Sequence, residues 1–226
     1  MNKYAVIVAG GSGSRMGTQV PKQFLLLHSR PVLWHTLNAF LNAYEDLEIV
    51  LVLPEEHMET GQKILGATHA PHRIRAITGG ETRFHSVKKG LDCLSDRSII
   101  FVHDGVRCLV TPSLIHRCFD KALETGNAIP AIRCMDSIRV EMPEGNQAID
   151  RDKIRIIQTP QTFSSELLQS AFGQVYQESF MDEAVVVERM GVKINLVEGD
   201  PSNIKITRPI DLMIAEKILE DRALTI

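Results

Sequence analysis

The chain has 226 residues, of which 44% are hydrophobic and 23% charged, and its formal net charge is −3. This composition is typical of a globular protein, and a chain of this length buries a core without disulfides or a structural metal. The nearly balanced charge disfavours a nucleic-acid-binding protein, which normally has a basic face. No segment reaches the ~20 apolar residues that cross a bilayer.

The cysteines and the start of the chain indicate a cytoplasmic location. The four cysteines form no CxxC pair and have no spacing typical of a zinc site, so reduced thiols are expected. The first apolar stretch is short and is soon interrupted by glycine, which does not fit a signal peptide.

Short runs rich in valine and isoleucine alternate with longer amphipathic segments. The runs are almost continuously apolar, as in strands that are covered on both faces. The alternation predicts an α/β fold with a doubly wound, mainly parallel sheet, in which ligands bind beyond the carboxyl ends of the strands. The expected strands are Tyr4–Ala9, Leu47–Leu53, Ile74–Ile77, Ile99–Val102, Ala128–Ile132, Ile154–Ile157 and Ile194–Val197. The expected helices are Val32–Leu41, Met58–Leu65, Ser86–Leu94, Pro112–Leu123, Ser165–Val175, Asp182–Met190 and Pro209–Leu219, the last with Thr207 as its cap.

A glycine-rich loop, Ala9–Gly17, follows the first strand, and the cations Arg15 and Lys22 lie in and just after it. Glycines let the backbone pass close to a ligand and turn its N–H groups toward one point, which favours an anion. A plain strand-to-helix turn would need only one glycine. The pattern therefore predicts a phosphate-binding loop.

This loop matches neither of the two commonest phosphate-binding patterns. It lacks the Lys-Ser or Lys-Thr pair of a P-loop, and Met16 stands where a dinucleotide-binding loop has its third glycine. Met16 therefore disfavours one alternative, an NAD-dependent oxidoreductase in which Glu55 would be the acidic residue after the second strand. A non-catalytic nucleotide-binding module is a further alternative.

Two more strand ends have polar motifs. Gly79-Gly80-Glu81 follows the third strand, either as a turn with a helix cap or as part of a binding site. Asp104 follows the apolar run Ile99–Val102, where a carboxylate can bind Mg²⁺ together with substrate phosphates or can cap the next turn.

Residues Arg133–Arg151 interrupt the alternation. Two strand-like halves, Ser137–Met142 and Ala148–Asp150, flank a turn at 143–146 and predict an inserted β-hairpin arm. A hairpin of this size is marginal alone, so we expect it to pack on a partner subunit. Surface decoration is the alternative.

The order G-G-x-G-x-R-M followed by P-K resembles the sugar-phosphate nucleotidyltransferases. With Thr159-Pro160-Gln161 and the segment Glu198–Thr207, the resemblance extends over essentially the whole chain to the 2-C-methyl-D-erythritol 4-phosphate cytidylyltransferase family. It implies a Rossmann-like nucleotidyltransferase fold in one domain, 1–226, and a homodimer formed through the arm, 133–151. Ribitol-5-phosphate cytidylyltransferases share the glycine loop and are the alternative within the class.

The resemblance also implies the substrates and the roles of residues. CTP and a polyol phosphate would be the substrates and Mg²⁺ the cofactor, with Asp104 as its ligand. Arg15 and Lys22 would be catalytic. The implied nucleotide-binding residues are Ala9, Gly10, Gly11, Gly13, Gly80, Glu81, Arg83, Ser86 and Gly105, and those that position the acceptor are Arg107, Arg151, Thr159 and Lys205. The chain departs from the common family pattern at Gly10, Gly105, Val106, Cys108, Ser137, Met181 and Ser202.

Overall fold

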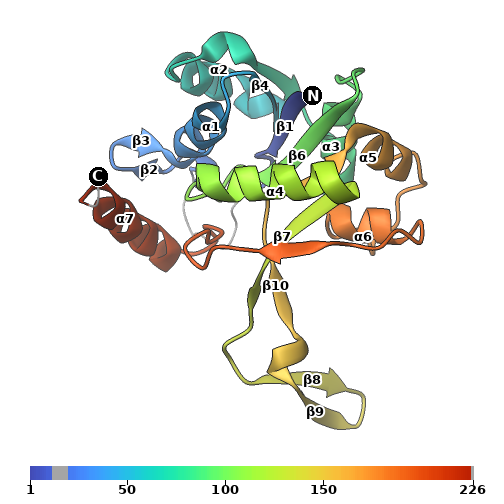
Figure 1. Ribbon diagram of the computed structural model, residues 1–226. Coiled ribbons are helices and arrows are strands. Elements are labelled where there is room, and N and C mark those ends of the chain that lie inside the picture. The colour runs from blue at the N-terminus through green and yellow to red at the C-terminus, as the bar shows by residue number, and fades with distance from the viewer. Residues whose placement is uncertain (12–19, 225–226) are drawn as a thin grey trace.

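A central sheet of eight strands forms the body of the molecule (Figure 1). The computed structural model describes residues 1–11 and 20–224. The strands run in the order β10-β7-β11-β6-β1-β4-β5, with β12 paired to β7. Their bounds are β1 Asn2–Val8, β4 Leu47–Leu53, β5 Ile74–Thr78, β6 Ser98–Asp104, β7 Asn127–Arg133, β10 Arg155–Ile157, β11 Gln161–Ser164 and β12 Leu196–Glu198.

The pairing is mainly parallel, as predicted. β1 lies between β6 and β4, and β5 follows β4, all in parallel. The carboxyl ends of these four strands therefore meet at one edge, where the motifs after Val8, Thr78 and Val102 converge.

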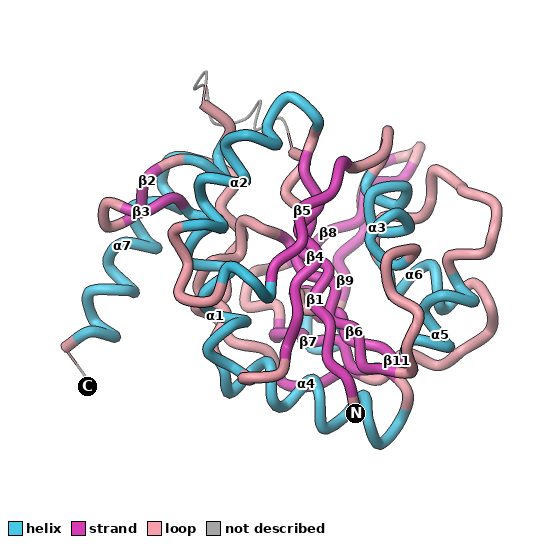
Figure 2. Tube along the Cα trace, turned by 90° about the horizontal axis from the view of Figure 1, so that it is seen from above, coloured by secondary structure: helices cyan, strands magenta, loops and turns pink. Residues whose placement is uncertain are grey.

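Helices cover both faces of this sheet (Figure 2). On β1, Ala5 and Ile7 belong to the core shared with α1, α2 and α4, whereas Val6 and Val8 belong to the core shared with α3, α5 and α6. Alternate side chains of β1 therefore point to opposite faces of the sheet, and both faces are buried. This explains why the sequence of β1 is continuously apolar. The helices are α1 Val32–Ala43, α2 Met58–Gly66, α3 Arg83–Leu91, α4 Pro112–Thr125, α5 Ser165–Ala171, α6 Glu183–Glu188 and α7 Pro209–Ala223. Short 3₁₀ turns lie at Lys22–Phe24, Glu55–His57, Pro71–Arg73 and Arg151–Lys153, and a small pair is formed by β2 Leu26–Leu27 and β3 Arg30–Pro31.

One strand and one cap differ from the sequence-based expectation. β11 was not predicted, yet it is inserted antiparallel between β6 and β7. Pro160 and the polar residues Gln161 and Thr162 hide its apolar pattern. The prediction of Thr207 as the cap of α7 was wrong, because Asp211 in the first turn accepts the N–H groups of Thr207 and Arg208, and Arg208 is the cap residue.

The hairpin predicted within 133–151 is present and projects from the body (Figure 1). Its strands are β8 Ile138–Met142 and β9 Gly145–Ile149, which pair with each other in antiparallel register. Most of its side chains are exposed, including the apolar Met135, Val140 and Met142. The arm thus presents apolar side chains away from the core of its own subunit.

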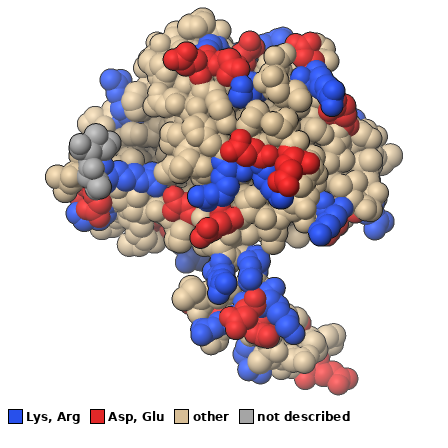
Figure 3. Space-filling view, in the orientation of Figure 1, with Lys and Arg blue, Asp and Glu red and all other residues tan. Residues whose placement is uncertain are grey.

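Charged side chains of both signs are interspersed over the body and the arm on the face shown in Figure 3. Among the residues that the structure describes, no helix has the length and apolar character needed to cross a membrane.

Candidate active site

A cavity of about 530 Å³ opens where the carboxyl ends of β1, β4, β5 and β6 meet. Its walls come from segments far apart in the sequence, so the sheet topology creates the site. The cavity brings together ten of the residues expected to bind substrates or metal: Ala9, Gly10, Gly11, Lys22, Gly80, Glu81, Arg83, Ser86, Asp104 and Lys205.

The glycine loop forms one wall and is tied at its base. The Gln23 side-chain amide donates to the Ala9 carbonyl at 2.8 Å, and the Ala9 N–H donates to Val52 at 2.9 Å. Lys22, on the adjacent 3₁₀ turn, is buried except where it lines the cavity. The expected contributions of Gly13 and Arg15 lie outside the described residues.

The Gly79-Gly80 turn forms the opposite wall. The Gly80 N–H donates to the Ser86 hydroxyl at 3.1 Å, and Thr82 caps α3 by accepting the N–H of His85. A Cβ on Gly80 would come within 2.5 Å of the Cβ of His85, so only glycine fits this close approach. The motif is therefore both a capped turn and a wall of the cavity.

Asp104 lies at the end of β6 among three cations. Its carboxylate is 3.0 Å from Lys205 Nζ, 3.3 Å from Arg83 Nη2 and 3.5 Å from Arg107 Nε. Burial alone would raise the pKa of Asp104, but Arg83, Lys205 and Arg107 outweigh that effect and hold the pKa well below its usual range. The group is therefore ionised at any physiological pH, and two of its cations, Arg83 and Lys205, line the cavity with it.

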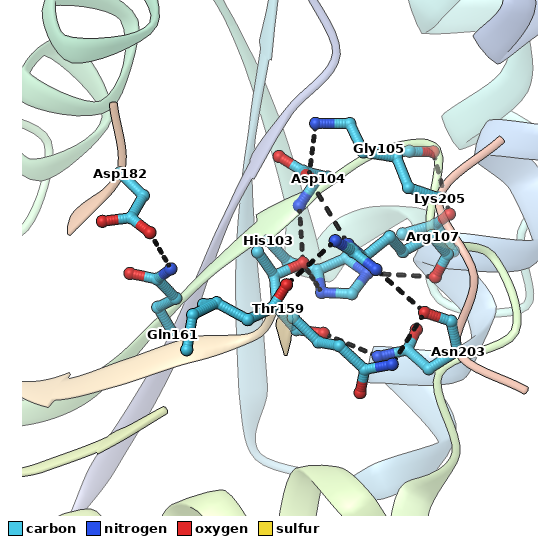
Figure 4. A network of polar contacts seen from close by, with 12 residues as sticks. His103, Asp104, Gly105, Arg107, Thr159, Gln161, Asp182, Asn203 and Lys205 are labelled. Carbon is cyan, nitrogen blue, oxygen red and sulfur yellow. Dashed lines mark hydrogen bonds and ion pairs between the residues drawn. The ribbon is translucent and has the colours of Figure 1, made fainter. Parts of the chain in front are cut away.

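The backbone of Asp104 is held by a buried network (Figure 4). Thr159 Oγ1 accepts the Asp104 N–H at 3.2 Å and lies 2.9 Å from His103 Nδ1. His103 Nε2 lies 3.1 Å from the Arg107 carbonyl oxygen, which can only accept. The imidazole proton is therefore on Nε2, and the Thr159 hydroxyl donates its hydrogen to Nδ1. Burial lowers the pKa of His103 to about 3 and keeps the ring neutral.

The segment that carries Lys205 is attached to the same network (Figure 4). Arg107 Nη1 donates to the Asn203 carbonyl at 2.9 Å, and the Asn203 side chain donates to the Thr159 carbonyl at 2.8 Å. The Ile206 N–H donates to Val106 at 3.0 Å. These contacts fix Lys205 beside Asp104.

Some expected residues do not line the cavity, and Arg107 is one of them. Gly105 is buried beneath the floor of the cavity, where the Gly105 N–H donates to the Val8 carbonyl oxygen at 2.9 Å. Thr159 is also buried, below Asp104. Arg151 is on the arm, donates to the Met135 carbonyl at 2.7 Å and does not line the cavity of its own chain.

Glu183 is joined to this site although no pattern in the sequence indicated it there, and Gln161 was expected only as part of the Thr159-Pro160-Gln161 motif. Glu183 is buried at the start of α6, and its carboxylate binds both Nη atoms of Arg83. Burial raises the pKa of Glu183, and the Arg83 guanidinium opposes that effect. An acidic residue in the first turn of a helix ordinarily indicates only a favourable dipole interaction, so the sequence offered no signal for this pair.

The donor set fits a magnesium ion that is shared with substrate phosphates. Within residues 1–11 and 20–224, no three His, Cys, Asp or Glu side chains gather as a metal site. Mg²⁺ is commonly bound through one or two carboxylates together with substrate phosphates. Asp104, ionised and facing the cavity, is suited to that arrangement.

Comparison with known proteins identifies the family. The sequence model described as 2-C-methyl-D-erythritol 4-phosphate cytidylyltransferase matches residues 4–221. The chain belongs to this family. Proteins of that name from Bacteroides thetaiotaomicron and Porphyromonas gingivalis are 42% and 44% identical to it, over 97% and 96% of this chain and 100% and 97% of their own lengths.

Solved structures agree with this membership of the cytidylyltransferase family. The 4-diphosphocytidyl-2C-methyl-D-erythritol synthase of Anaerococcus prevotii superposes with a TM-score of 0.82 at 26% identity, covering 97% of this chain and 98% of the other. The 2-C-methyl-D-erythritol 4-phosphate cytidylyltransferase of Thermus thermophilus gives a TM-score of 0.74 at 28% identity, with 95% and 98% covered. The Rossmann-like fold expected from the sequence is confirmed, and the chain is a nucleotidyltransferase.

Proposed function

We propose that the chain transfers the cytidylyl group of CTP to 2-C-methyl-D-erythritol 4-phosphate, releasing pyrophosphate and forming 4-diphosphocytidyl-2-C-methyl-D-erythritol. Family membership over residues 4–221 supports this activity. The observation that carries it is the position of ionised Asp104, with Lys205 and Arg83 beside it, in a glycine-walled cavity.

The nucleotide occupies the cavity in this proposal. Its triphosphate lies along Gly10 and Gly11 with Lys22 beside it, because the backbone N–H groups of a glycine loop and a cation suit an anion. Ala9, whose N–H is bound to Val52, holds the start of this loop in place. Cytosine and ribose lie against Gly80, Glu81 and Ser86, with Gly105 supporting the floor. Gly13 and Arg15, which belong to the same loop in the sequence, complete the phosphate site.

The acceptor phosphate lies beside Lys205 and Arg107, and Arg151 reaches it from the partner subunit. Thr159 has another role, since its hydroxyl hydrogen is already donated to His103. We therefore assign Thr159 to holding the Asp104 turn rather than to donating to the acceptor phosphate.

The transfer forms one P–O bond and breaks one. An acceptor phosphate oxygen attacks the α-phosphorus of CTP in line, and the bond to the β-phosphate breaks as pyrophosphate leaves. The nucleophile is already an anion, so a general base is not needed. The barrier lies in bringing two anions together, and positioned cations such as Lys22 and Lys205 lower it.

Mg²⁺ would be held by Asp104 and the CTP phosphates, and when bound it neutralises charge on the triphosphate. The three cations around Asp104 keep the carboxylate ionised for this purpose.

The arm supports a homodimer. Exposed Val140 and Met142 lie on a hairpin that pairs only with itself among the described strands, and such a hairpin gains stability by packing. A dimer would also bring Arg151 to a site that its own chain does not offer it. The four cysteines are free thiols, which supports the expected cytoplasmic location.

The test is pyrophosphate release by the purified chain with Mg²⁺ and CTP. 2-C-methyl-D-erythritol 4-phosphate and ribitol 5-phosphate are offered in parallel, and ATP, GTP and UTP replace CTP in control reactions. We expect turnover with the first acceptor and with CTP. Turnover with ribitol 5-phosphate alone would keep the chemistry and refute the acceptor.

A further inference from the structure

A buried carboxylate outside the cavity is joined to the site through one arginine. Glu183 is 1% exposed, and its two oxygens bind Nη1 and Nη2 of Arg83, the second at 3.1 Å. The same Nη2 lies 3.3 Å from Asp104 Oδ1. Arg83 therefore spans from the protein interior to the carboxylate at the centre of the site.

Stability alone is a weak reason for this arrangement. Taking two charges out of water costs several kcal/mol per ion, and apolar residues of similar volume often replace such pairs without loss. In this pair the Glu183 carboxylate is fully buried, whereas Arg83 also lines the cavity. The pair thus fixes the orientation of a cation that faces the ligand.

Glu183 is itself fixed by the same segment of chain that fixes Asp104. Gln161, on β11, accepts the Ala184 N–H at 2.7 Å and donates to Asp182 at 3.0 Å, so it holds both sides of Glu183 (Figure 4 shows the second contact). Two residues earlier, Thr159 accepts the Asp104 N–H. The segment from Thr159 to Gln161, at the entry to β11, therefore places both ends of the Glu183–Arg83–Asp104 chain.

We propose that Glu183 is a positioning residue for the transfer, which acts by holding the Arg83 guanidinium at a fixed place beside Asp104 in the wall of the nucleotide cavity. With two of its N–H groups bound to Glu183, Arg83 does not turn fully onto Asp104. Asp104 therefore keeps capacity for its metal, and Arg83 stays in the wall of the cavity. This inference rests on the proposed function, because it assigns a role within the same site.

The first variant is Glu183→Gln, which keeps the size of the side chain and removes its charge. Arg83 retains Asp104 as a counter-ion, so the change leaves no isolated buried cation and we expect the fold to be kept. A displacement of about 1 Å in a reacting site can cost about 100-fold in rate, and we expect kcat/KM for CTP to fall on that scale. Glu183→Asp keeps the charge on a shorter stem and should recover part of the loss. Glu188→Gln is the matched control on the same helix, since Glu188 is exposed, and it should behave as wild type.

A second pair of variants separates action through Arg83 from a general effect on packing. If Glu183 acts through Arg83, Arg83→Met and Arg83→Met/Glu183→Gln should have the same kcat/KM. The double variant should be the more stable of the two, because Arg83→Met alone leaves a buried carboxylate unpaired. Losses that add across the cycle would overturn the proposal.

CTP binding without acceptor, measured by calorimetry, gives a readout that does not depend on turnover. Loss of one well-placed charged hydrogen bond weakens binding about tenfold or more, and this is expected for Glu183→Gln but not for Glu188→Gln. If the wild-type chain binds CTP but releases no pyrophosphate with 2-C-methyl-D-erythritol 4-phosphate, the proposed function fails while the ratio of affinities still tests Glu183. Glu183→Gln with wild-type melting temperature, CTP affinity and kcat/KM would refute the role of Glu183.

Discussion

Replacing Thr159 with valine tests whether its hydroxyl serves the protein or the acceptor. The hydroxyl accepts the Asp104 N–H and donates to His103 Nδ1, and both partners are buried. Valine has the same shape and satisfies neither group. Each orphaned buried group costs about 1–3 kcal/mol, so Thr159→Val should lose about 2–6 kcal/mol of unfolding free energy. Thr159→Ser keeps the hydroxyl and loses one methyl group, which costs about 1 kcal/mol.

Urea unfolding can be followed by the fluorescence of Trp34, the single tryptophan of the chain. With a slope of about 3 kcal/mol per molar urea, the midpoint of Thr159→Val should fall by ~1–2 M. Turnover should fall with it, because the Asp104 turn is no longer held, while Thr159→Ser should remain near wild type in both. An unchanged urea midpoint together with a higher KM for the acceptor would refute the reasoning, since it would indicate that Thr159 donates to the acceptor phosphate.

Three further predictions concern a cation, a histidine and the arm. Lys22→Ala should lower kcat by about 10²–10³-fold, as for other preorganised donors, and near-wild-type turnover would remove Lys22 from the mechanism. Burial lowers the pKa of His103 to about 3, whereas the pKa of histidine in the unfolded chain is near 6.5. The neutral ring therefore supports the fold fully above that unfolded pKa, and the free energy of unfolding should fall by about 2 kcal/mol between pH 7 and pH 5. His103→Gln should lack that part of the decrease in urea midpoint; an equal decrease in both proteins would contradict the assignment. Mixing inactive Lys22→Ala and Arg151→Ala subunits should restore activity, because a mixed dimer has one site with both residues intact, and no recovery after verified subunit exchange would show that Arg151 does not serve the partner.

Strands buried on both faces were the most predictable part of this fold. Leu47–Leu53 was predicted with its observed bounds because every position but Glu48 is apolar and buried. β11 escaped prediction because Gln161 and Thr162 are polar, and their burial depends on hydrogen bonds and neighbours far away in the sequence. A local pattern cannot reveal such contacts.

The site shows the same division. The place of Asp104 followed from the strand before it, and the convergence of the glycine motifs followed from parallel topology. The Glu183–Arg83 pair joins residues that are 100 positions apart, and no spacing rule relates them. The roles of His103 and Thr159 depend on which atom carries a hydrogen, which only the assembled network decides.

The close fit of Gly105 against β1 has a consequence for engineering the enzyme toward other nucleotides. A Cβ on Gly105 would come within 2.9 Å of the Ala9 Cβ and 3.3 Å of the Val8 carbonyl oxygen, so a side chain here requires a shift between the Asp104 turn and the start of the glycine loop. Variants with a larger residue at Gly105 would therefore change the distance between the Asp104 turn and the glycine loop as well as the shape of the cavity. Exposed Glu56 and Glu81 line the same cavity, and variation there would alter selectivity while the spacing of the catalytic groups stays fixed.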